Sequence, residues 1–246
     1  KNYPDPKYLL DNYGADALRA YLTSSPASHA EDLRFSETGV KEIVRSVLLP
    51  LWNAYSFFTT YARADQWEPS QSTDFIKRLK NPLDQWLLSR MQSLLSSIEE
   101  KMKVYHLYEV VPEVIGFIDE LTNWYIRLNR RRFWSDEKSE DKDLAYSTLY
   151  IVLMDFCKAL APILPFVTEE IYQNLKSGSA FKESIHLCRY PEADRALVNS
   201  DLEAEMSLVQ KVVYMGRTIR NTNKLKTRQP LKEFLVITRN PNDQKT

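Results

Sequence analysis

The stretch NPLDQWLLSRMQSLLSSIEEKM, residues 81–102, predicts a long amphipathic helix. Asn81 and Pro82 have the residue types that favour a helix N-cap and first helical position. The apolar residues that follow recur every three or four positions, so they share one face: Leu83, Trp86, Leu87, Met91, Leu94, Leu95, Ile98 and Met102. A helix with one apolar face needs other helices to cover it, so this stretch favours a helical bundle.

Further segments on both sides repeat this helical pattern. The long helix that opens at Ser36 should be kinked but not ended by Pro50, because its apolar periodicity continues beyond the proline. Residues 63–75 read as a polar linker. Only 5 glycines occur in 246 residues, which also favours helix. We therefore predict a mainly all-α fold, with helices over about 5–14, 15–23, 36–61, 81–102, 107–134, 144–160 and 165–178.

The pattern changes toward the C-terminus. The segment SIHLCRY, residues 184–190, alternates as a short strand does, and KEFLVIT, residues 232–238, also reads as a strand. Between them, residues 200–221 predict another amphipathic helix. The last strand has no visible partner, so we expect a small α+β extension that is cut short.

Composition excludes several classes of protein. Cys157 and Cys188 are far apart and form no CxxC pair, which favours a reducing, cytoplasmic setting over a disulfide framework. No apolar run is long enough to span a membrane. The three histidines are scattered without metal-ligand spacing, and no nucleophile motif occurs, so we predict neither a metal site nor a catalytic site. The pair Glu169 and Glu170 is expected to stabilise the start of a helix.

Charge is concentrated although the formal net charge is zero. The segment NWYIRLNRRRFW, residues 123–134, combines arginines with aromatic rings, and no acidic residue occurs from Met206 to Lys232. Such surfaces bind polyanions, and exposed rings stack on unpaired bases. In the alternative interpretation, the arginines pair with acids on neighbouring helices. Part of the segment must belong to the core, because three of its positions continue one helical line from Leu121: Tyr125, Leu128 and Arg132.

Six segments together resemble the C-terminal part of class I isoleucyl-tRNA synthetases of the eukaryotic cytosolic type. They occur in the family's order and cover nearly the whole chain: YGADALRAYL (13–22), SPASHAEDLRFSETGVKEIVRSVLLPLWNAYSFF (25–58), LTNWYIRLNRRRFW (121–134), LAPILPFVTEEIYQNL (160–175), SIHLCRYPEAD (184–194) and GRTIRNTNKLKTRQPLKEFLVI (216–237).

The resemblance implies a class I synthetase anticodon-binding helical bundle. Residues 1–35 would form the end of a stem-contact region just after the KMSKS loop, 36–195 the bundle, and 196–246 the start of a C-terminal appendage. The HIGH, KMSKS and editing sites would lie outside the chain, so it should bind without catalysing. The implied parent would use ATP and Mg²⁺ to join isoleucine to its tRNA. Implied partners are the anticodon stem-loop of isoleucine tRNA and the parent's catalytic and editing domains.

The resemblance and the charge pattern together select candidate tRNA contacts. We expect Arg127, Arg130 and Arg131 to bind phosphates or bases, because guanidinium groups bind phosphate bidentately and stack on bases. Trp134 is a candidate stacking ring, whereas Trp124, Tyr125 and Phe133 should mostly pack. A second set of cations should contact the backbone of the RNA: Arg217, Arg220, Lys224, Lys226 and Arg228.

Three interpretations remain open at this point. Asp16 and Arg19 of the DALR segment are spaced to pair with each other on a helix that joins the stem region to the bundle. The chain also fits the equivalent domain of a valyl, leucyl or methionyl synthetase. More distantly, it fits a helical protein-interaction module whose basic runs bind an acidic partner.

Overall fold

The computed structural model describes residues 4–70, 72–178 and 181–237, and these residues form helices without any strand. They fall into two units, one up to Val198 and one from Asn199. The first unit contains α1 (Pro6–Thr23), α2 (Glu37–Ile43), α3 (Leu49–Ala64), α4 (Pro82–Lys103), α5 (Val110–Asp119), α6 (Arg127–Trp134), α7 (Glu140–Leu160) and α8 (Pro165–Leu175). The second contains α9 (Ser200–Thr222). The predicted mainly all-α fold is confirmed.

Short 3-10 and π elements complete the first unit. Two π-helical turns join α-helices: η2 (Val44–Leu48) connects α2 to α3, and η5 (Glu120–Ile126) connects α5 to α6. The 3-10 turns are η1 (Pro26–His29), η3 (Asp74–Arg78), η4 (Leu107–Glu109), η6 (Ile185–Leu187) and η7 (Arg195–Leu197).

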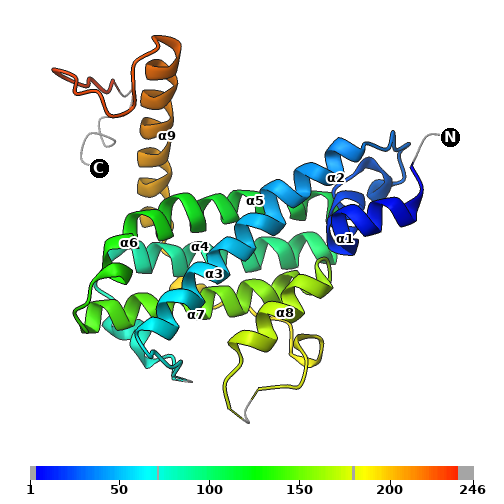
Figure 1. Ribbon diagram of the computed structural model, residues 1–246, viewed down its shortest axis with the longest axis horizontal. Helices are drawn as coiled ribbons and strands as arrows, with labels where there is room; N and C mark the ends of the chain where they lie inside the picture. The colour runs from blue at the N-terminus through cyan, green and yellow to red at the C-terminus, as the bar shows by residue number, and fades with distance from the viewer. Residues whose placement is uncertain (1–3, 71, 179–180, 238–246) are drawn as a thin grey trace. The chain divides into compact units, whose positions relative to one another are not determined.

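Helix α7 lies at the centre of the first unit. Of its 21 residues 14 are buried, because it packs against α3, α4, α6 and α8. Figure 1 shows α4, α5 and α7 running alongside one another, with α3 crossing them. Burying apolar side chains from several helices along one central helix supplies most of the driving force for such a bundle.

The helix continues past Pro50, as its sequence predicts. The π turn η2 lies directly before it, and α3 continues to Ala64. Proline has no N–H for the carbonyl one turn earlier, and its ring crowds that carbonyl. A widened turn at this point accommodates both effects, so the apolar face stays in contact with the bundle.

Helix α1 is fixed to the start of α8 by hydrogen bonds from its DALR segment. The buried carboxylate of Asp16 accepts from the backbone N–H groups of Phe166, at 3.3 Å, and Val167, at 2.7 Å. Arg19 donates to the backbone carbonyls of residues 162–163, at 2.8 and 3.1 Å. The expectation that Asp16 and Arg19 pair with each other is therefore wrong, because both side chains bind main-chain groups of the α7–α8 turn.

Helix α1 also packs closely on α2. A side chain at Gly39 would collide with the ring of Tyr21, so the two helices meet without one there. Tyr13 donates to the carboxylate of Glu37 at 2.6 Å. The glycine at position 14 has φ 80° and ψ 162°, which bends α1 between the two helices that its sequence predicts.

The two predicted strands are wrong. Within 184–190 the chain forms the 3-10 turn η6, and the carboxylate of Glu169 accepts from the N–H of Ile185 at 2.9 Å and from the hydroxyl of Ser184 at 2.9 Å. Residues 232–237 form neither helix nor strand, and Thr238 lies outside the described residues. A strand needs a neighbour to pair its backbone groups, and no described segment offers one.

Candidate nucleic-acid interface

The π turn η5 decides which side of α6 faces the bundle. A straight helix would place Leu121, Tyr125 and Leu128 on one line, as its sequence suggests. Leu121 and Tyr125 are buried, but Leu128 is 54% exposed. A π turn contains one residue more than an α turn, which rotates the following helix by about 100°. The buried positions of α6 are consequently Asn129 and Phe133.

Arg132 is held inside the first unit. Its two terminal nitrogens donate to the two carboxylate oxygens of Asp84 on α4, each at 2.9 Å. Its Nε donates to Asp141 at 2.8 Å, and Nη1 also donates to Asn129 at 2.9 Å. Its side chain is only 13% exposed. Arg132 therefore acts as an anchor between α4, α6 and α7 and has no donor free for a ligand.

The charges around Arg132 support each other. Burial works against its charged form, but the hydrogen bonds and charge of Asp84 outweigh burial and raise the pKa of Arg132. The hydroxyl of Tyr125 donates to the same carboxylate at 2.8 Å. Burial first, and then the negative charge of Asp84, raise the pKa of Tyr125 well above its usual value. Arg132 thus stays charged and Tyr125 stays neutral at physiological pH.

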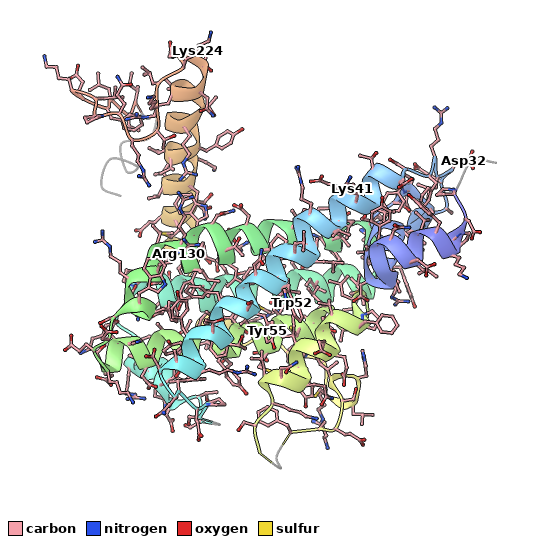
Figure 2. All side chains as sticks on the ribbon, in the orientation of Figure 1. Asp32, Lys41, Trp52, Tyr55, Arg130 and Lys224 are labelled. Atoms are coloured by element: carbon pink, nitrogen blue, oxygen red, sulfur yellow. The ribbon has the colours of Figure 1, made fainter. Side chains whose placement is uncertain are left out.

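The other three arginines of α6 point away from this network. Arg127, Arg130 and Arg131 are exposed, and none forms an ion pair with any residue in the described ranges. Figure 2 shows Arg130 on the outer side of α6. Its guanidinium carbon lies 5.9 Å from the ring centroid of Trp134, which is 53% exposed. Two turns of one helix thus display three cations and one flat ring to solvent.

Three acidic residues of the run after α6 bind partners other than these cations. Glu140 pairs with Arg78 at 2.9 Å, and Asp141 binds Arg132. Asp143 accepts from the indole nitrogen of Trp67 at 2.7 Å. These three carboxylates are engaged elsewhere and do not pair with the exposed arginines of α6.

The second set of predicted residues lies in the second unit. Arg217 is on α9, and the exposed side chains of Lys224, Lys226 and Arg228 follow its end. Figure 2 labels Lys224 just beyond the last turn. No side chain of α9 is buried. The structure therefore brings Arg127, Arg130, Arg131 and Trp134 together on one helix, and places the remaining five candidates in another unit.

The cations that follow Thr222 do not continue the helix. Lys224 has φ 55°, a left-handed conformation that ends α9, and the N–H of Leu225 donates back to the carbonyl of Arg220 at 2.8 Å. Arg220 also donates to the carbonyls of Lys226 and Gln229, each at 2.9 Å. Arg220 consequently organises the segment after the helix with part of its hydrogen-bonding capacity.

Trp67 is a residue whose role the sequence pattern does not reveal. It lies in the segment predicted to be a polar linker, yet its ring is stacked with that of Tyr146, with centroids 5.6 Å apart. Phe75, at the end of the same linker, is buried. A tryptophan and a phenylalanine among polar residues are the only signals that this segment packs on α7.

The described residues form neither a metal site nor a membrane-spanning helix. Among the described residues, no group of three or more histidine, cysteine or acidic side chains comes together as a metal site would require. None of the described helices is both long enough and apolar enough to cross a bilayer.

Comparison with known proteins adds independent findings. Residues 84–235 match the family model described as the anticodon-binding domain of tRNA ligase. The chain is 45% identical over 98% of its length to an isoleucine–tRNA ligase of Protochlamydia amoebophila. It is 48% identical over 96% of its length to that of Chlamydia pneumoniae, and 42% identical over its full length to that of Treponema denticola.

The chain spans only 22–23% of the length of these relatives. All three are bacterial, so the expected eukaryotic type stays a prediction. Among solved structures, a leucyl-tRNA synthetase in a ternary complex with tRNA, from Agrobacterium radiobacter K84, is similar in fold. It matches with a TM-score of 0.53 at 15% identity, over 80% of this chain and 22% of that one.

Proposed function

The chain belongs to the anticodon-binding domain family of tRNA ligases, and from this premise we propose that it binds the anticodon stem-loop of isoleucine tRNA. It would act as part of a cytoplasmic isoleucine–tRNA ligase that holds the tRNA while catalytic and editing domains outside this chain act on it. Those domains would supply the use of ATP and Mg²⁺.

The exposed face of α6 is the observation that carries this proposal. Arg127, Arg130 and Arg131 project three guanidinium groups that form no ion pair with a described carboxylate. Bidentate binding of phosphate oxygens by such groups releases counterions from RNA. Trp134 next to Arg130 offers a flat surface for an unstacked base. Arg132 contributes indirectly, because its buried network fixes the direction of the face.

The second unit supports a further contact with the RNA backbone. Arg217, Lys226 and Arg228 are exposed and have no acidic partner in the described ranges. Lys224 shares their charge, and Arg220 keeps donors beyond the two that it uses. A dispersed set of cations suits the sugar–phosphate backbone, which carries no sequence information by itself.

The relatives favour an isoleucine–tRNA ligase over the ligases for other amino acids. The three named above are isoleucine–tRNA ligases at 42–48% identity. The leucyl enzyme shares the fold at 15% identity, which says nothing about the amino acid.

Changing both Arg130 and Arg131 to alanine tests the proposal. We expect weaker binding of isoleucine tRNA and a smaller dependence of log K on log salt, by roughly 0.7–0.9 for each phosphate that the protein no longer neutralises. Filter binding at several salt concentrations measures both quantities. The thermal unfolding midpoint should stay the same, because both side chains are exposed.

Arg45→Ala serves as the matched control, since Arg45 is 79% exposed and lies on η2. It should leave the salt dependence unchanged. If the double variant binds tRNA with the original affinity and slope, the α6 face is not the binding surface. A loss of stability in place of a loss of binding would instead assign both arginines to packing.

A further inference from the structure

A cavity of about 440 Å³ is lined by α7 and by residues of the α3–α4 connection, among them Trp67 and Phe75. Its volume falls within the range of small-molecule sites. Four aromatic rings from separate parts of the chain line it: Trp67, Phe75, Tyr150 and Phe181. Aromatic walls of this kind suit a flat, conjugated ligand better than a flexible one.

Two of these walls are fixed in place. The indole nitrogen of Trp67 donates to Asp143 at 2.7 Å, and the ring is stacked with Tyr146. The hydroxyl of Tyr150 donates to the carbonyl of Leu175 at 3.3 Å. A planar ligand would therefore enter a largely preformed site and would not have to order these rings.

A single ion pair supplies charged groups to the cavity. Asp155 and Lys158 are one turn apart on α7, and Nζ of Lys158 lies 3.0 Å from Oδ1 of Asp155. Both side chains are mostly buried, with 24% and 27% exposed, respectively. Neither makes another hydrogen bond within the described ranges. Each carboxylate oxygen can accept two hydrogen bonds, so both oxygens of Asp155 can still accept from a ligand, and two ammonium protons of Lys158 remain to donate.

We propose that this cavity binds a guanine base. The Watson–Crick edge of guanine places two neighbouring N–H donors beside a carbonyl oxygen. The two donors match the paired oxygens of the Asp155 carboxylate, and the carbonyl matches the ammonium of Lys158. The aromatic walls would cover the faces of the purine.

The same geometry disfavours the other bases. Adenine and cytosine offer one amino group beside a ring nitrogen that accepts, and this acceptor would face an oxygen of Asp155 without a proton between them. Uracil has a single N–H between two carbonyls. Only guanine presents two adjacent donors followed by an acceptor, so the pair selects it by hydrogen bonding and not by size.

The site does not depend on the α6 face. None of Arg127, Arg130 and Arg131 lines the cavity. Guanine binding could therefore hold if those arginines did not contact tRNA, and the two proposals fail separately. The base could come from a free nucleotide or from single-stranded RNA, which share the same recognised edge.

Calorimetric titration of the purified chain with GMP and AMP tests the proposal. We expect GMP to bind at least about tenfold more tightly than AMP, the discrimination typical of a bidentate contact to a base. The methyl signal of Met154, which lines the cavity, should shift in NMR spectra with GMP. Two short oligoadenylates, with and without one guanine, distinguish a base within RNA from a free nucleotide.

Variants locate the contact. Asp155→Asn replaces an acceptor by a donor and should remove the preference for guanine. Glu42→Gln is the control, because it breaks a similar but exposed pair with Arg45 and should leave the preference for guanine unchanged. The double change at Arg130 and Arg131 should leave GMP binding intact. If Asp155→Asn does not fold, Lys158→Gln tests the carbonyl contact in its place.

The proposal is overturned if GMP and AMP bind equally, if neither they nor the guanine-containing oligonucleotide bind, or if Asp155→Asn keeps the preference. If guanine tightens binding only within the oligonucleotide, and Asp155→Asn abolishes this effect, the site is supported and RNA is the source of the base.

Discussion

Four arginines within six residues of one another have two different roles. Arg132 is buried against Asp84 and Asp141, whereas Arg127, Arg130 and Arg131 are exposed. The difference comes from their position on the helix and not from their chemistry. A run of like residues on a helix therefore divides into those that face the neighbouring helices and those that face solvent.

Replacing Arg132 by alanine should destabilise the protein strongly. The variant leaves Asp84, which is 1% exposed, as a buried charge without its cation. We expect the free energy of unfolding to fall by about 3–5 kcal/mol, as for other broken buried pairs. Urea unfolding followed by circular dichroism measures the loss.

Arg131→Ala is the matched comparison, one position earlier on the same helix. Because Arg131 is exposed, its removal should change the free energy of unfolding by less than about 0.5 kcal/mol. If the free energy of unfolding of Arg132→Ala falls by no more than this small amount, the network around Asp84 does not stabilise the fold.

The sequence predicts much of this residue-level arrangement. It assigns Tyr125 and Phe133 to packing and Trp134 to the surface, and the structure confirms these positions. It fails for Leu128, because a π turn leaves no trace in the pattern of apolar residues. It also does not single out the pair of Asp155 and Lys158, since charges three apart on a helix usually form a solvated pair.

At the scale of elements, α8 depends on a residue from another helix. Leu164 occupies the N-cap position of α8 and has no side-chain acceptor. The N–H groups in the first turn of α8 therefore find no acceptor in their own helix. Asp16 on α1 provides the acceptor in its place. This contact fixes α1 to the bundle and caps α8 at the same time.

Asp16→Ala should therefore weaken two elements together. We expect a loss of about 0.5–2 kcal/mol, the range for a lost helix cap. The amide protons of Phe166 and Val167 should exchange faster with solvent, whereas those in the middle of α7 should not. Hydrogen–deuterium exchange detected by NMR measures this pattern.

Asp11→Ala gives the comparison on the same helix, since Asp11 is exposed. It should leave exchange at both amides unchanged. If Asp16→Ala also leaves exchange there unchanged, the cap does not depend on Asp16.

Element types follow from sequence wherever the apolar period is long. The helices that contain Pro50 and Trp86 are predictable because their periodicity extends over several turns. The segment 184–190 misleads the prediction, because short alternation does not distinguish a strand from a turn whose N–H groups bind a neighbouring carboxylate, here that of Glu169. The partners that decide such cases lie far away in the sequence.

At the scale of the molecule, the positive charge is divided between two units. The first presents cations on α6, and the second presents them on α9 and the segment after it. A predominantly electrostatic contact can form anywhere along the RNA backbone, whereas stacking on an aromatic ring requires an unpaired base. The two units can thus contribute differently to the binding of one tRNA.

Reversing the charge of Arg217, Lys226 and Arg228 to glutamate separates these contributions. We expect binding to weaken by a similar factor for isoleucine tRNA and for unrelated tRNAs, because phosphates are common to all. Competition filter binding with several tRNAs measures the ratio. Since all three residues are exposed, the unfolding midpoint should stay the same.

Loss of binding restricted to isoleucine tRNA would show that the second unit reads bases. An unchanged affinity for every tRNA would remove the second unit from the proposed interface. Replacing Lys103, an exposed cation on α4, by glutamate provides a control for a charge reversal outside the proposed interface.

The π turn between α5 and α6 makes the function of the chain sensitive to the loss of a single codon. Deleting one residue from 120–126 would restore an ordinary α turn and rotate everything beyond it. Residues that now meet solvent would then be driven against α4 and α7, and Phe133 would leave its place in the core. A gene that is one codon shorter here would still encode every arginine of α6, but the protein would present them in the wrong direction.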